Sequence, residues 1–173
     1  MKTITRTKIY LPIAGMILTA ALALPAAAQT QAPFKGTFQG NVTISPPFVT
    51  QSITGIGTLV GQFSSTQVLA TGPSGSTGTV TWIAANGDTI VTTEVGSGVF
   101  VDMAPCQVVG AEPGDTYRKS TQIYTITGGT GRFAGVQGSF TQTLYKDSRL
   151  SSDGTYHACG SYSGTITSPG AVR

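Results

Sequence analysis

The chain of 173 residues is poor in charge, because only 10% of its residues are Asp, Glu, Lys or Arg. Three of the ten basic residues lie within residues 1–28, so the rest of the chain carries seven basic and seven acidic side chains. A neutral domain offers no electrostatic basis for binding nucleic acid or an anionic membrane surface, although the sequence pI is near 9.0. We therefore expect no nucleic-acid partner.

Metal-ligating and cofactor-binding patterns are also scarce. Two cysteines and one histidine fall short of the four clustered ligands of a closed tetrahedral zinc site. The series Gly129-x-Gly131-x-x-Ala134 fits a dinucleotide fingerprint in its letters. That fingerprint requires a helix after the glycines, and an alternating strand pattern follows here instead. We expect neither a metal nor a cofactor.

No apolar run is long enough to span a membrane, and the longest has the features of a signal peptide. Leu11 to Leu24 gives 14 residues, whereas a membrane-spanning helix needs about 20. Basic residues precede this run, and Pro25 and Ala26-Ala27-Ala28 follow it, which is typical of cleavage after Ala28. The alternative is a retained membrane anchor. We predict a signal peptide over residues 1–28 and an exported domain, periplasmic or secreted, over residues 29–173.

The two cysteines, Cys106 and Cys159, are expected to pair. Export leads to an oxidising compartment, where disulfides form and persist. The alternative is a reactive thiol, since His157 lies two residues before Cys159 and shares its face of a strand. A disulfide is the favoured interpretation.

Helical periodicity is absent after the signal peptide, whereas alternation with a period of two recurs throughout. Gly, Ser and Thr make up 61 of residues 29–173, but spaced aromatic and β-branched residues favour strands over a disordered linker. Asn86-Gly87 predicts a tight hairpin. Strands are expected at residues 34–44, 50–60, 62–71, 79–85, 89–95, 117–127, 136–146 and 155–167, with a short apolar segment at 99–101. Seven or eight strands with short connections predict an antiparallel barrel or sandwich.

One segment, Asp102 to Asp115, is long and irregular. A loop of this length in a small domain is usually functional or held in place by a cross-link. Cys106 lies within it and offers that cross-link.

The glycine-rich segment 128–135 predicts a tight turn between two strands, with Phe133 as an apolar plug. Residues 126–138, Ile-Thr-Gly-Gly-Thr-Gly-Arg-Phe-Ala-Gly-Val-Gln-Gly, resemble the signature turn of the allene oxide cyclase and dirigent-protein barrels and their bacterial exported members. The resemblance implies an all-β fold, an eight-stranded antiparallel calycin-like barrel after an N-terminal signal peptide. It also implies an apolar cavity and a homotrimer.

The plant members of these families direct cyclisation or radical coupling of hydrophobic small molecules. The His-Asp element of dirigent proteins is absent from Phe34 to Ile44, and no counterpart of the cyclases' cavity Asn and Glu can be matched. The resemblance therefore assigns no catalytic residue, and the catalytic residues are unknown. A Ser-His-acid triad with His157 and Asp153 or Asp147 is disfavoured because no nucleophile-elbow pattern is present.

Candidate ligand-binding residues are aromatic or charged residues set among small ones, a mixture that gives a pocket its shape and a few polar anchors. They are Trp82, Tyr124, Tyr145, Arg118 and Glu94. The alternative is core packing for Trp82 and Tyr124, and solvated surface charge for Arg118 and Glu94.

These observations favour an exported barrel that binds a small hydrophobic molecule in its lumen or acts as an inert module at the envelope. The alternatives are a cyclase-, isomerase- or dirigent-like enzyme acting on such a molecule, and an outer-membrane barrel. The third is disfavoured because no terminal aromatic and no aromatic girdles can be found. We expect no integral membrane association after cleavage.

Overall fold

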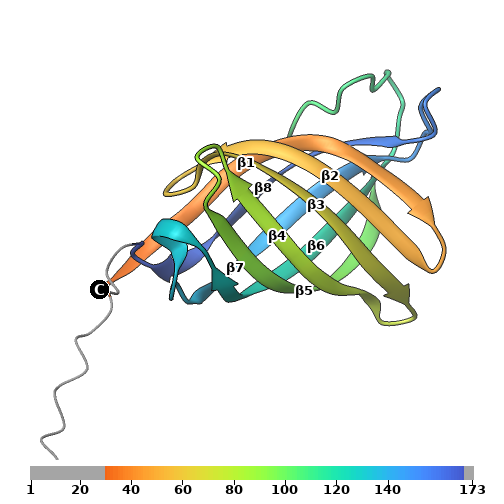
Figure 1. Cartoon of the computed structure of the whole chain (residues 1–173). Helices are drawn as coiled ribbons and strands as arrows, with labels where there is room; N and C mark the ends of the chain where they lie inside the picture. The colour runs from red at the N-terminus through yellow and green to blue at the C-terminus, as the bar shows by residue number, and fades with distance from the viewer. Residues whose placement is uncertain (1–29, 170–173) are drawn as a thin grey trace, which may run out of the picture.

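The computed structural model describes residues 30–169; the predicted signal peptide and its cleavage after Ala28 lie outside the described residues. Eight antiparallel strands follow one another around a closed barrel, and the last strand pairs with the first (Figure 1). The strands are β1 (Gln31–Ser45), β2 (Phe48–Gly57), β3 (Gly61–Gly72), β4 (Gly75–Ala84), β5 (Thr89–Val101), β6 (Tyr117–Gly129), β7 (Gly138–Asp147) and β8 (Tyr156–Thr167). The predicted all-β eight-stranded barrel is confirmed.

Alternation along each strand separates the lumen from the outer face, as expected from the period of two. On β1, Phe34, Phe38 and Val42 are buried and their odd-numbered neighbours are mostly exposed. Strand β5 unites two predicted segments, 89–95 and 99–101, into one. The intervening Gly96 and Gly98 weaken the apolar pattern in the sequence because they face the lumen without side chains.

The lumen near the start of β1 is filled by six aromatic side chains, here called the aromatic cluster. Trp82 lies at its centre, with ring centroids 5.1–5.5 Å from those of four neighbours. Tyr124 stacks on Phe140 with an interplanar angle of 6°. Such pairs stabilise a core beyond their apolar burial. The members are Phe34, Phe63, Trp82, Tyr124, Phe140 and Tyr162, and each is at least 95% buried.

Inward-facing glycines make room for these rings. A Cβ atom at Gly55 would lie 2.7 Å from the ring of Phe63, and one at Gly160 would overlap the ring of Phe38. At Gly164 it would lie 2.5 Å from the Cα atom of Phe140. Glycine at these three positions is therefore a packing requirement.

The turn after β6 closes this end of the barrel. A short 3₁₀ helix, η1 (Gly131–Phe133), lies in this turn (Figure 1). Phe133 is fully buried in the hydrophobic core, which agrees with its predicted role as a plug. Gly131 has a φ of +55°, a conformation that favours glycine. The Arg132 guanidinium donates to the main-chain oxygen of Val60 at 3.1 Å, and its Nε lies 3.6 Å from the Asp88 carboxylate.

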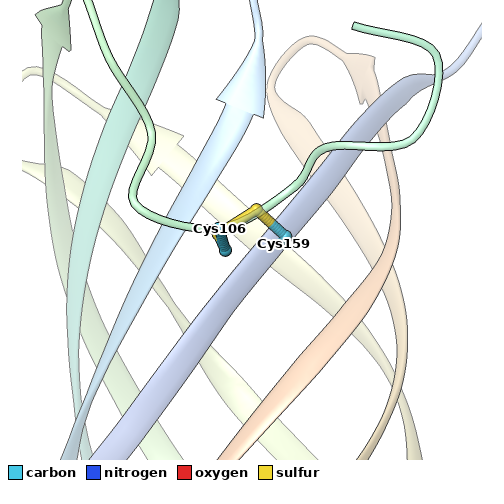
Figure 2. The surroundings of a disulfide bond; sticks show 2 residues. All are labelled: Cys106 and Cys159. Carbon is cyan, nitrogen blue, oxygen red and sulfur yellow. A yellow bond between two sulfur atoms is a disulfide. The ribbon is translucent and has the colours of Figure 1, made fainter.

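Cys106 and Cys159 form a disulfide with a Cα–Cα distance of 6.1 Å, as predicted. The β5–β6 loop, residues 102–116, runs over the outside of the barrel and is joined there to β8 (Figure 2). Arg149 holds the same loop, because its guanidinium lies 2.7 Å from Glu112 and 3.0 Å from Asp115. The irregular segment is thus fixed in place by a covalent bond and an ion-pair network. Among residues 30–169 there is no helix long and apolar enough to cross a membrane.

The packing predicts that Gly164→Ala destabilises the barrel. The added methyl group meets the backbone of β7, and overpacking of this kind costs about 1–3 kcal/mol. Urea denaturation followed by tryptophan fluorescence measures the change in the free energy of unfolding. Gly72→Ala is the matched control, since a Cβ atom there meets nothing within 4 Å. Equal stability of the two variants would contradict the proposed fit.

Loss of the disulfide is expected to lower the free energy of unfolding by about 4 kcal/mol, because the bond closes a long loop in the unfolded chain. The two cysteines are 53 residues apart. The double variant Cys106→Ser/Cys159→Ser, measured by urea denaturation, gives this value. Reductant should destabilise the unsubstituted protein and leave the double variant unchanged; an effect on both would show that reductant acts elsewhere.

Candidate functional site

The end of the barrel opposite η1 holds an open cavity of about 430 Å³, here called the mouth cavity. This volume lies within the range of small-molecule sites. Its walls combine aliphatic side chains with hydroxyl, amide and cationic groups. The inward-facing lining residues include Val42, Val49, Gln51, Leu69, Ser76, Gly96, Gly98, Phe100, Arg118, Ser120, Gln122, Leu144, Lys146 and Tyr156.

A layer of buried polar side chains separates the mouth cavity from the aromatic cluster. Along β6 the inward residues change from Tyr124 through Gln122 to Arg118, and along β7 from Phe140 through Gln142 to Lys146. This polar layer consists of Gln51, Gln67, Glu94, Gln122 and Gln142, each at least 95% buried. The floor of the mouth cavity is therefore polar although its walls are largely apolar.

The polar layer is partly connected by hydrogen bonds. Tyr124 donates its hydroxyl to Gln67 Oε1 at 2.9 Å, and Gln142 Nε2 donates to Gln122 Oε1 at 2.9 Å. Within residues 30–169, three oxygens of the layer have no hydrogen-bond partner: Gln51 Oε1, Glu94 Oε2 and Gln142 Oε1. A buried polar group without a partner costs free energy, so Gln51 Oε1, whose residue lines the mouth cavity, favours a donor entering from that cavity.

Glu94 is the carboxyl group of the polar layer. Ser76 Oγ donates to its Oε1 at 3.0 Å. Burial raises the pKa of Glu94, and the contacts with Ser76 and Gln122 lower it by less. The environment thus favours the neutral acid, which can donate as well as accept a hydrogen bond.

Arg118 lies at the rim of the mouth cavity, where Gly98 on the neighbouring strand makes room for its side chain. A Cβ atom at Gly98 would lie 2.8 Å from the Arg118 Nε atom. The guanidinium carbon lies 5.8 Å from the centroid of the exposed Phe100 ring. The inward-facing Gly98 therefore leaves space for the guanidinium beside the opening, and the Phe100 ring lies next to that group.

Lys146 lies on β7 as the cross-strand neighbour of Arg118 and is only 8% exposed. Its Nζ atom lies 3.5 Å from the centroid of the Tyr156 ring and donates to the Asp147 main-chain oxygen at 3.3 Å. Burial, and then the nearby charge of Arg118, lower the pKa of Lys146 to about 8, although Asp147 acts in the opposite direction. Two cationic groups thus converge on one cavity.

The candidate residues taken from the sequence divide into three groups. Trp82 and Tyr124 are fully buried in the aromatic cluster, where they pack against other rings. Arg118 lines the rim of the mouth cavity, whereas Glu94 lies in the polar layer beneath it, where it accepts from the lining residue Ser76. Tyr145 lies on the outer side of β7, since its neighbours Leu144 and Lys146 face the lumen.

Sequence reasoning missed Lys146, Gln51 and Gln122. The alternation of residues 136–144 already placed Phe140, Gln142 and Leu144 on one face. Continuing that period by one step places Lys146 on the same face, so this signal was available.

The residues considered for a catalytic triad, a reactive thiol or a metal site are not arranged for these functions. His157 Nδ1 lies 2.9 Å from Asn41 Oδ1, whereas Asp153 accepts from the Thr155 hydroxyl at 2.7 Å and Asp147 from the Arg149 amide at 2.8 Å. Cys159 is in the disulfide, so the reactive-thiol alternative is wrong. Over residues 30–169, no three His, Cys, Asp or Glu side chains are grouped to hold a metal ion.

A larger hollow of about 860 Å³ lies beside the disulfide. It is lined mostly by outward-facing residues of β1 to β4, and no Asp, Glu, Lys, Arg or His side chain contributes to it. The mouth cavity is therefore the site where charge, amide groups and apolar walls occur together.

No protein-family model, no curated protein and no solved structure matches the chain. The resemblance of residues 126–138 to the cyclase and dirigent barrels stays a prediction.

The lowered pKa of Lys146 predicts a pH-dependent stability. Between about pH 8 and the ordinary lysine range the unfolded chain binds more protons than the folded chain, so stability rises with pH. Lys146→Met removes this contribution, and its stability relative to the unsubstituted protein should fall as pH rises from 7 to 10. Urea midpoints across that range measure it, with Lys119→Met on the outer face as the control. A constant difference between the Lys146 variant and the unsubstituted protein would contradict the assignment.

Proposed function

We propose that this protein binds a small amphipathic molecule carrying an anionic group in the mouth cavity. The observation that carries the proposal is the pair of cations at the cavity, Arg118 and Lys146. Neither forms a salt bridge within residues 30–169, where the ion pairs are made by Arg132 and Arg149. A carboxylate, sulfonate or phosphate group would supply the missing negative charge.

The electrostatics of the cavity support an anion over a cation. Two basic side chains, Arg118 and Lys146, line the cavity, whereas the one carboxyl group of the polar layer, Glu94, has a pKa raised by burial, so the local balance is positive. Attraction between charges is stronger in a partly desolvated cavity than in water. Charge-assisted hydrogen bonds from the guanidinium would then orient the ligand at the rim.

The walls support an apolar body for the same ligand. Val42, Leu69 and Leu144 face the lumen between the rim and the polar layer. Burial of apolar surface against them contributes about 25 cal/mol per Å². The polar layer below limits how deep an apolar group can go, because its unpartnered oxygens favour a hydrogen-bond donor.

We also propose that the domain works outside the cytoplasm, in a periplasmic or secreted location. The signal-peptide pattern of residues 1–28 and the disulfide both support export. The outer face supports a barrel that is not embedded in lipid. Its cross-strand neighbours are often hydroxyl residues, such as Thr79 beside Thr93 and Thr93 beside Thr125.

A cyclase- or dirigent-like activity, and the trimer that accompanies it, rest on the resemblance of residues 126–138 alone. These residues form the closed end of the barrel, and Phe133 fills the lumen there. The mouth cavity lies at the other end, so the turn supports the fold and says little about the ligand.

Fluorescence titration with anilinonaphthalene sulfonate and with uncharged phenylnaphthylamine tests the proposal, because the two probes share their aromatic body. We expect the sulfonate to bind about tenfold or more tightly than the neutral probe, since a charge-assisted hydrogen bond contributes about 1.5–3 kcal/mol. Arg118→Gln should remove most of that preference. Lys119→Gln, next in sequence and on the outer face, is the matched control.

Gly98→Leu places a side chain in the mouth cavity and should weaken both probes. Its folding is checked by circular dichroism and the urea midpoint. Absence of probe binding to the unsubstituted protein, or equal binding to the folded Gly98→Leu variant, would overturn the proposal.

A further inference from the structure

The three lysines of residues 30–169 occupy different environments. Lys35 and Lys119 belong to the outward-facing sets of β1 and β6. Lys146 alone among the three faces the lumen, and its exposed fraction is 8%. A long, entropically costly cation is therefore held inside the barrel where an aliphatic residue would fill the space.

The contacts of Lys146 orient its amine without neutralising it. The Tyr156 ring lies against it from β8, at 3.5 Å from Nζ to the ring centroid. Arg118 faces it from β6, and on β7 Asp147 offers its main-chain oxygen at 3.3 Å. The Asp147 carboxylate is engaged elsewhere, since it accepts from the Arg149 amide at 2.8 Å. The amine thus meets an aromatic face, a second cation and the open cavity.

This environment is typical of a lysine that reacts. An amine becomes nucleophilic when desolvation and a neighbouring cation favour its neutral form. With a pKa of about 8, Lys146 is neutral in about one tenth of the molecules at pH 7, far more than an ordinary lysine. Arg118 supplies a positive charge for an anionic ligand, so the Lys146 amine can take a different role, that of a nucleophile.

We propose that Lys146 binds an aldehyde or ketone covalently, as an imine, with the apolar body of the carbonyl compound in the mouth cavity. The nitrogen lone pair attacks the carbonyl carbon and a C–N bond forms. The carbonyl oxygen then leaves as water, taking both amine hydrogens, so the step needs no oxidant or reductant. The inference rests on the proposed function in one respect, that a small molecule enters the mouth cavity.

The partner chemistry follows from the two cations. Arg118 and Lys146 are cross-strand neighbours on β6 and β7, so Arg118 can bind an anionic group of the same ligand whose carbonyl carbon meets the less exposed amine of Lys146. The favoured ligand is thus an apolar or aromatic aldehyde or ketone with a carboxylate at one end. Water that enters the cavity hydrolyses the imine, so the adduct is reversible.

Reductive trapping tests the inference. The full mature protein is incubated with formylbenzoate and cyanoborohydride, and the modified lysines are located by peptide mass spectrometry. We expect Lys146 to be labelled about tenfold or more faster than Lys35 and Lys119, with a rate that rises with pH to a half-maximum near 8. Benzoate, which lacks the aldehyde, should compete and protect Lys146.

Two variants complete the design. Lys146→Arg keeps the positive charge and should lose the label at this peptide, whereas Lys119→Arg should retain the label on Lys146. Equal labelling of the three lysines, or an ordinary lysine pH profile for Lys146, would overturn the inference. The sulfonate titration then separates the two proposals: probe binding without selective labelling leaves the proposed function standing, and failure of both removes the cavity as a site.

Discussion

The width of the closed barrel is the constraint on which the rest of the structure depends. Eight strands fix the lumen, and the inward side chains must fill it without overlap. At the closed end the aromatic cluster does so because Gly55, Gly160 and Gly164 have no side chains to compete with the rings. At the other end, Gly96 and Gly98 face the lumen beside long polar side chains. Inward-facing glycines therefore accommodate large side chains at both ends, with a filled core at one end and a cavity at the other.

The polarity of the lumen also increases from the closed end of the barrel to the open end. Aromatic rings give way to the polar layer, and the polar layer to a cavity with Arg118 and Lys146 at its sides. Buried amides and a buried carboxyl group are costly unless they are satisfied or used. Their position below a cavity of about 430 Å³ is one of the observations that support the proposed ligand binding. The lowered pKa of Lys146 and the raised pKa of Glu94 have the same origin, since burial disfavours the charged form of each.

The long β5–β6 loop is fixed to the outside of the barrel by contacts of its own. Its disulfide and the Arg149 ion pairs hold it on the outside of the barrel, away from the mouth cavity. A loop of this length left free beside the opening would compete with a ligand for the rim. The cross-link leaves access to the cavity through the mouth and stabilises the fold by constraining the unfolded chain.

The sequence by itself determined the strands and their two faces, because alternation with a period of two depends only on local backbone geometry. It also determined the pairing of Cys106 and Cys159 and the role of Phe133. The alternation alone left barrel and sandwich undecided, since it shows that one face is buried and not that β8 pairs with β1; the barrel was predicted from the resemblance of residues 126–138. In the candidate site, too, some residues were predicted from the sequence and others were not. Glu94 and Arg118 were predicted, whereas Lys146 and Gln51 were missed, although the alternation of β7 places Lys146 on the inward face. Only the tertiary structure decided which polar side chains share a cavity, because that depends on closure and register between segments far apart in the chain.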